Sequence, residues 1–278
     1  MKSLFDVPAP AKLNLFLHIV GRRDDGYHLL ESVFMLIDWC DTLHFELRAD
    51  GAISREDLTT PLPADDLIVR AARALQTLTG TPHGVHIGIA KHIPEQAGLG
   101  GGSSDAASTL LALNRLWGLG LSLAQLRQLG LQLGADVPFF LNGYNAWVSG
   151  IGEQMTPVML PPARFVVVKP GDGLQTGRIF SHPTLKRDTK TATILDFTTD
   201  AYVFGHNDLQ SVAELLCPSV TQALAWCSKR GLSGRMTGSG SAVFARIAED
   251  FEIGNAPGFL IKECRNLAVH PLQGWAAK

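Results

Sequence analysis

A run of glycine and serine at residues 98–104 (GLGGGSS) is the clearest sign of chemistry in this sequence. A stretch rich in helix formers follows over residues 105–116. A glycine loop that enters a helix exposes backbone N–H groups at the positive end of the helix dipole, where phosphate chains bind. Glycine lets the backbone approach the phosphates closely, and Ser103 and Ser104 add hydroxyls for phosphate oxygens or a magnesium ion. The alternative interpretation is a flexible surface loop with a serine N-cap.

The three common nucleotide loops fit these glycines poorly. A Walker loop needs a lysine directly after its last glycine, and no lysine follows here. A dinucleotide fingerprint has its third glycine at the sixth position, which is Ser103 when counted from Gly98. A protein-kinase loop runs into a strand, whereas this one runs into a predicted helix. The loop therefore indicates a different class of nucleotide site.

The segments around the glycine loop predict the elements that position it. Residues 85–89 alternate in hydrophobicity, which predicts a strand before the loop. A further helix is predicted over residues 122–134, because Gln125 completes a capping box with the serine at its start and a glycine ends it. Asp136 and Pro138 are then expected in the turn directly after this helix.

The N-terminal part predicts a long hairpin. Residues 13–20 show the period-two pattern of a half-buried strand, and by parity Lys12 and Asn14 share its second face. Residues 24–26 supply turn chemistry, and residues 29–37 are typical of a returning strand.

The second half of the chain mixes predicted strands (residues 165–169 and 242–247) with predicted helices (residues 208–217 and 219–230). Such mixing indicates an α+β or α/β layer architecture. Three prolines within residues 156–162 cannot continue a helix or a central strand, so we predict a domain boundary there.

Composition narrows the function. The 278 residues carry a formal net charge of −2, and no run of basic residues is present, which argues against nucleic acid as a partner. No window approaches the roughly 18 apolar residues of a membrane span, so no membrane partner is expected. The four cysteines show neither CxxC nor metal-ligand spacing, which favours a reducing, cytoplasmic location.

Several motifs together resemble the GHMP small-molecule kinases. They lie, in the expected order, at residues 10–15, 26–28, 94–104, 133–140 and 237–241. The resemblance implies an α+β, two-domain GHMP kinase fold with the active site between the domains. The first domain (residues 1–156, ATP-binding) would resemble domain 2 of ribosomal protein S5, and the second (residues 157–278, on the substrate side) would be ferredoxin-like.

The resemblance also implies a catalytic pair, Lys12 and Asp136. The reaction would be ATP-dependent phosphorylation of the 2-hydroxyl of a cytidyl diphosphate-linked methylerythritol, in the non-mevalonate isoprenoid pathway. Such chemistry is plausible, because Asp136 can accept the hydroxyl proton. Lys12 beside it would keep that carboxylate ionised and stabilise charge on the moving phosphoryl group. The expected cofactors are ATP and Mg²⁺, and the chain would be a monomer or weak homodimer.

Motif matches assign further residues to each ligand. Expected to bind ATP are Lys91, Pro94, Glu95, Gln96, Ala97, Gly98, Leu99, Gly100, Gly101, Gly102, Ser103 and Ser104. Expected to bind the substrate are Asn14, Tyr27, His28, Thr176, Phe180, Gly238, Ser239 and Gly240. Tyr27 and Phe180 would stack on the cytosine, and His28 would hydrogen-bond its edge. Glu95 and Asp105 depart from the family pattern, and an extra acid at Asp105 weakens anion binding unless it faces a cation.

Three alternatives remain open from the sequence. The chain could be a GHMP kinase for another alcohol, such as mevalonate or homoserine, although Tyr27, His28 and Phe180 argue against this. It could be a non-catalytic nucleotide-binding member of the fold, which would be expected to lack Lys12 or Asp136. An RNA-contacting module is suggested only by the S5-like topology, and the absence of a basic stripe argues against it.

Overall fold

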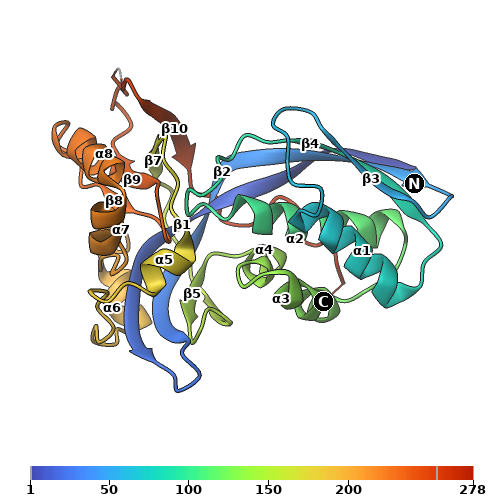
Figure 1. Ribbon diagram of the computed structural model, residues 1–278, viewed down its shortest axis with the longest axis horizontal. Coiled ribbons are helices and arrows are strands. Elements are labelled where there is room, and N and C mark those ends of the chain that lie inside the picture. The colour runs from blue at the N-terminus through green and yellow to red at the C-terminus, as the bar shows by residue number, and fades with distance from the viewer. Residues whose placement is uncertain (1, 255, 278) are drawn as a thin grey trace.

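The computed structural model describes residues 2–254 and 256–277, which form two sheets, each with its own helices (Figure 1). The first sheet has six strands in the order β3-β4-β2-β5-β6, with β1 paired to β2. Its strands are β1 (Ser3–Arg22), β2 (His28–Arg48), β3 (Ile53–Asp57), β4 (Gly84–Ala90), β5 (Ala146–Ser149) and β6 (Gln154–Pro157). The predicted hairpin is confirmed, because β1 and β2 pair antiparallel along their length.

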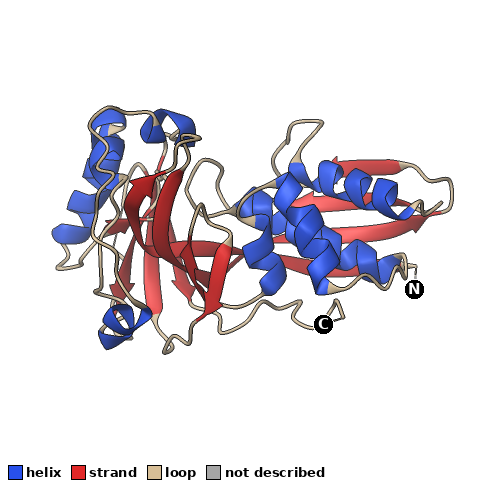
Figure 2. Cartoon of the chain, turned by 90° about the horizontal axis from the view of Figure 1, so that it is seen from below, coloured by secondary structure: helices blue, strands red, loops and turns tan. Residues whose placement is uncertain are grey.

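Four helices cover one side of this sheet (Figure 2). They are α1 (Leu67–Thr79), α2 (Gly101–Leu116), α3 (Leu123–Leu133) and α4 (Val137–Asn142). The capping box predicted for α3 is present, with Ser122 and Gln125 bonded to each other's backbone N–H groups. Helix α2 begins at Gly101, earlier than predicted, so the glycine loop itself forms the first turn of the helix.

The second sheet has four antiparallel strands in the order β10-β7-β9-β8. They are β7 (Arg164–Pro170), β8 (Arg235–Met236), β9 (Val243–Ile247) and β10 (Phe259–Arg265). The helices of this half are α5 (Thr176–Phe180), α6 (Ile194–Thr199), α7 (Gln210–Leu216) and α8 (Pro218–Ser228). Both predicted strands and both predicted helices of the second half are therefore confirmed.

Strand β1 is buried on both faces, so the prediction of a half-buried strand was wrong. Successive residues such as Leu15 and Phe16 have at most 1% of their surface exposed. The reason is that β1 belongs to the first sheet but also contacts the second half, where Leu17 forms a parallel bridge to Asn207. Leu13 and Phe16 share one apolar cluster with residues of β7 and β9.

Further observations bear on the predicted organisation. Asp136 lies in the turn after α3, as predicted, and is also the N-cap of the short helix α4. Pro138, predicted in the same turn, lies instead in the first turn of α4, where proline is well tolerated. The stretch at residues 156–162 begins in the last two residues of β6 and continues into the connection to β7. The last segment returns to the first half, since the Leu123 N–H donates to the Ala277 carbonyl at 2.8 Å. None of the helices in the described residues is long and apolar enough to cross a membrane.

Candidate active site

A cavity of about 890 Å³ lies where the two halves meet, beside the start of α2. Its wall contains most of the residues that the sequence predicts to bind ATP and substrate. These are Lys12, Asn14, Lys91, residues 94–103, Asp136, Thr176, Phe180 and residues 238–240. The other three predicted residues, Tyr27, His28 and Ser104, do not line it.

Two glycine turns from opposite halves of the chain contact each other at this cavity. The Ser241 N–H donates to the Gln96 carbonyl at 3.1 Å. Gly98 has φ 74°, and a Cβ atom on it would overlap the carbonyl oxygen of Thr237. A Cβ atom on Gly238 would in turn lie 3.0 Å from the Gly98 carbonyl oxygen. The close approach of the two turns therefore depends on glycine.

We expect Gly98→Ala to damage both stability and nucleotide binding. The alanine would adopt a left-handed conformation, which costs about 1–2 kcal/mol, and its methyl group would also force the two turns apart. We predict a lower free energy of unfolding in urea and a KM for ATP raised roughly tenfold, on the scale of one lost contact. Gly80→Ala is the matched control, because Gly80 also has positive φ (63°) but open space around its Cβ position. Equal unfolding free energies for the two variants would contradict this account.

The start of α2 has the properties of an anion site. Its N-cap is Gly100, with φ 73° and no side-chain hydrogen bond to the first turn. Residues 101–103, which form that first turn, line the cavity. Uncapped N–H groups and the helix dipole together favour a phosphate group at this position. Ser103 lines the cavity, whereas the hydroxyl of Ser104 is buried.

Lys12 and Asp136 come together at the cavity. The Lys12 Nζ lies 3.7 Å from the Asp136 Oδ2, with side-chain exposures of 5% and 33%. The backbone holds the lysine against the glycine loop, because its N–H donates to the Leu99 carbonyl at 2.9 Å. The ammonium also lies 4.8 Å from the centre of the Phe34 ring. A buried cation thus meets a partly solvated carboxylate beside the predicted phosphate site.

Burial controls the charge of this lysine. It lowers the pKa of Lys12, and the nearby Asp136 carboxylate offsets part of that effect. The ammonium also donates to Oδ1 of Asn14. Asn14 is itself fixed, since its backbone N–H donates to Thr237 Oγ1 at 2.8 Å and its Nδ2 donates to Ser32 Oγ at 2.9 Å. The asparagine therefore orients the lysine.

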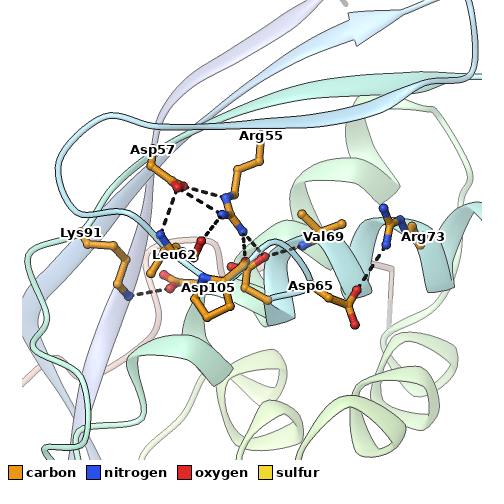
Figure 3. Close-up of polar contacts among 10 residues, drawn as sticks. Arg55, Asp57, Leu62, Asp65, Val69, Arg73, Lys91 and Asp105 are labelled. Carbon is orange, nitrogen blue, oxygen red and sulfur yellow. Dashed lines mark hydrogen bonds and ion pairs between the residues drawn. The ribbon is translucent and has the colours of Figure 1, made fainter.

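Lys91 lines the cavity, but its ammonium is already held by two carboxylates. It donates to Asp105 Oδ2 at 2.7 Å, as Figure 3 shows. It also donates to Asp41 Oδ2. Despite burial, these two neighbours raise the pKa of Lys91. Burial raises the pKa of Asp105, with Lys91 opposing and Asp41 adding to the shift. Asp105 thus faces the Lys91 ammonium. We therefore do not expect its acid group to weaken phosphate binding at the start of α2.

The cavity also includes residues that the sequence analysis did not predict. Leu62, Pro63, Asp66 and Leu67 line it at the start of α1. Asp66 is the N-cap of α1, and Arg55 holds it through an ion pair of 2.6 Å. An aspartate before an apolar helical stretch is an N-cap signal, so the start of α1 could have been found in the sequence.

The residues predicted to bind the cytosine lie at the tip of the β1–β2 hairpin and at the end of α5. The rings of His28 and Phe180 are 5.2 Å apart, centre to centre, and tilted by 40°. The Tyr27 side chain is 61% exposed at the hairpin tip. Thr176 contacts the second glycine turn, where its Oγ1 lies 2.7 Å from Ser239 Oγ. A base bound near Phe180 would therefore be adjacent to the turn at residues 238–240.

The side chains fit a magnesium ion that is held mainly by phosphate. Among residues 2–254 and 256–277, no three His, Cys, Asp or Glu side chains converge as metal ligands. Mg²⁺ in nucleotide sites is usually bound by one or two protein ligands together with phosphate oxygens and water. Ser103, which lines the cavity, offers such an oxygen ligand.

Known proteins resemble this chain over its full length. Residues 66–144 match the GHMP kinases N terminal domain, and residues 194–265 match the GHMP kinases C terminal domain. A protein of Albidiferax ferrireducens named 4-diphosphocytidyl-2-C-methyl-D-erythritol kinase is 70% identical over 277 residues, covering 99% of this chain and 96% of that protein. A protein of the same name from Acidovorax sp. (strain JS42) is 65% identical over 280 residues, covering 99% of each.

A solved structure is also similar. The crystal structure of a 4-(cytidine 5'-diphospho)-2C-methyl-D-erythritol kinase superposes with a TM-score of 0.75 at 35% identity. The match covers 89% of this chain and 90% of that one.

Proposed function

This chain belongs to the GHMP kinases and has their two-domain α+β fold, and we propose that it transfers the γ-phosphoryl group of ATP to the 2-hydroxyl of 4-diphosphocytidyl-2-C-methyl-D-erythritol. The products are the 2-phosphate and ADP, in the non-mevalonate isoprenoid pathway. The observation that supports this most directly is the contact between Lys12 and Asp136, 3.7 Å apart beside the uncapped start of α2. Relatives of 65–70% identity carry the name of this activity.

In the proposed mechanism the protein aligns donor and acceptor and balances charge. The first turn of α2 binds the phosphates of ATP through its N–H groups. Asp136 accepts the proton of the 2-hydroxyl as the oxygen attacks the γ-phosphorus. The Lys12 ammonium stabilises the negative charge on the phosphoryl oxygens. Asn14 holds that ammonium in place.

We assign Mg²⁺ to the phosphates of ATP, with Ser103 as the candidate protein ligand. When bound, it neutralises charge on the β- and γ-phosphate oxygens. Lys91 is a less direct ATP ligand than the sequence implies, because two carboxylates already hold its ammonium. Lys91 nevertheless lines the cavity, so we propose that its aliphatic part contributes packing against the nucleotide.

The remaining proposals concern the base site, location and assembly. Tyr27 and Phe180 would stack on the cytosine, and His28 would bind its edge. All four cysteines are unpaired, which fits a reducing compartment such as the cytoplasm. A monomer or weak homodimer remains our proposal for the oligomeric state.

An ADP-release assay with purified protein tests the proposed function. With ATP and Mg²⁺, we expect turnover on 4-diphosphocytidyl-2-C-methyl-D-erythritol at least 100-fold above that on mevalonate or homoserine, because only the first presents a base to Tyr27 and Phe180. Matching phosphorus NMR should show a new phosphate monoester on the polyol. Comparable turnover on mevalonate or homoserine would assign the chain to another alcohol. ATP binding without turnover on any of the three would indicate a non-catalytic member.

A further inference from the structure

One half-buried side chain, Arg187, joins the two elements that carry the predicted base site. Its Nε donates to Nε2 of His28 at 3.0 Å. Its Nη1 donates to the Leu185 carbonyl at 2.8 Å. Its Nη2 donates to the carbonyls of Phe180 and His182 at 3.2 and 2.9 Å. A single guanidinium therefore ties the start of β2 to the end of α5.

This contact determines which nitrogen of His28 carries the proton. A guanidinium can only donate hydrogen bonds, so the Nε2 atom that faces Arg187 must accept one. A neutral imidazole with an accepting Nε2 has its proton on Nδ1. Among the described residues Nδ1 has no hydrogen-bond partner. The ring is thus left with one free group, an N–H donor.

The charges around His28 keep it neutral. Burial, followed by the cations Arg187 and Arg22, lowers the pKa of His28. Arg22 is itself bound at the hairpin tip, where its Nε donates to the Gly26 carbonyl at 3.1 Å. No carboxylate contributes to this shift, so nothing near the ring favours the imidazolium. These groups therefore favour the neutral form of the ring, which the contact with Arg187 protonates at Nδ1.

We propose that Arg187 is a positioning residue that sets the base specificity of the substrate site, because it holds His28 as a donor at Nδ1. A donor at this position suits a pyrimidine whose ring N3 accepts a hydrogen bond, as in cytosine. It disfavours binding of a pyrimidine whose N3 carries a proton, as in uracil, because two hydrogen-bond donors would then face each other. The inference rests on the proposed function, because it requires the base of the substrate to bind beside His28 and Phe180, whose rings are 5.2 Å apart.

The direct test is the tautomer of His28, read by long-range ¹H–¹⁵N NMR of the full-length protein. In the wild type we expect Nδ1 to be protonated and Nε2 to be unprotonated. Arg187→Met should allow the Nε2–H form, which predominates in free histidine. Arg187→Lys keeps a donor near Nε2 and should retain the wild-type pattern. Arg178→Met is the matched control, because Arg178 is an exposed arginine of α5 outside the cavity.

The functional test compares kinetics on the cytidyl substrate and on its uridyl analogue. For the wild type we expect kcat/KM to favour the cytidyl substrate by roughly 100-fold or more, on the scale of a mispaired buried donor. Arg187→Met should raise KM for the cytidyl substrate about tenfold, leave kcat within about twofold, and reduce the discrimination at least tenfold. Arg187→Lys should restore most of the discrimination, and Arg178→Met should match the wild type.

The possible results separate this inference from the proposed function. A wild-type His28 protonated at Nε2 would overturn the inference, whatever the activity. Equal losses of kcat/KM on both substrates in Arg187→Met would also overturn it, because they would give Arg187 only a structural role. Absence of turnover on the cytidyl substrate in the wild type would instead remove the proposed function, while the tautomer measurement would still test the contact between Arg187 and His28.

Discussion

Replacing Asp136 with asparagine is expected to lower kcat by about 10²–10⁴-fold while ATP still binds. Asparagine keeps the shape of the side chain but cannot take up a proton at neutral pH. Asp136 is the N-cap of α4 but makes no side-chain capping bond, so the substitution removes no bond within the helix. The buried Lys12 ammonium loses its carboxylate partner but keeps its bond to Asn14, so we expect a moderately lower free energy of unfolding, measured by urea titration. The ATP affinity, measured by calorimetry, should be unchanged.

The control for this variant is Asp65→Asn, which changes an exposed aspartate whose partner is Arg73 at the protein surface. It should behave as the wild type in all three measurements. If Asp136→Asn kept more than about a tenth of the wild-type kcat, the proton would have another acceptor. A rise in substrate KM with unchanged kcat would show that Asp136 positions the alcohol and does not accept its proton.

Local patterns in the sequence were sufficient for many elements. The hairpin of β1 and β2 followed from period-two alternation and a turn, and α3 followed from the capping box of Ser122 and Gln125. These signals depend on residues that are close in sequence, and such signals survive in the folded chain. The family and its activity followed from motifs that extend over most of the chain, and the relatives found by comparison carry that name.

Other features depend on contacts between distant residues and could not be predicted from local patterns. Burial of both faces of β1 requires knowledge that the second half covers it. The partners of Lys91 are 50 and 14 residues away in sequence, at Asp41 and Asp105, so an isolated lysine gave no sign that its charge was already paired. Arg187 and His28 are separated by 159 residues. The sequence alone does not show which distant residues contact each other, so such side chains cannot be recognised as already paired.

The pair of Lys12 and Asp136 lies between these two cases. Neither residue alone has a local signal for catalysis, since a lysine on a strand and an aspartate after a helix are ordinary. The matched motifs predicted them as a pair. The structure adds the physical setting, in which the lysine is buried, bound to Asn14 and held against the glycine loop by its backbone N–H. Their catalytic roles stay predictions until tested by substitution.

Lys12→Met is expected to lower kcat without lowering the free energy of unfolding. Removal of a charge-stabilising donor usually costs about 10²–10³-fold in kcat, so we expect a loss of that size here. Methionine has a similar length without the charge, and burial of an ammonium is costly even when it is partly paired. The free energy of unfolding should therefore be equal to or higher than that of the wild type. Lys262→Met, at an exposed position of β10, is the control and should change neither quantity.

The pH dependence gives a second, independent test of the same lysine. Because burial lowers the pKa of Lys12, its charge is lost at a lower pH than that of an ordinary lysine. The kcat/KM of the wild type should fall as pH rises through that lowered pKa, and Lys12→Arg, which stays charged, should lack this alkaline limb. Between the lowered and the ordinary pKa the unfolded chain binds the extra proton, so unfolding free energy should rise with pH there. The same rise in Lys12→Met would assign it to another group, and a Lys12→Met variant that was both active and less stable would make Lys12 a structural residue.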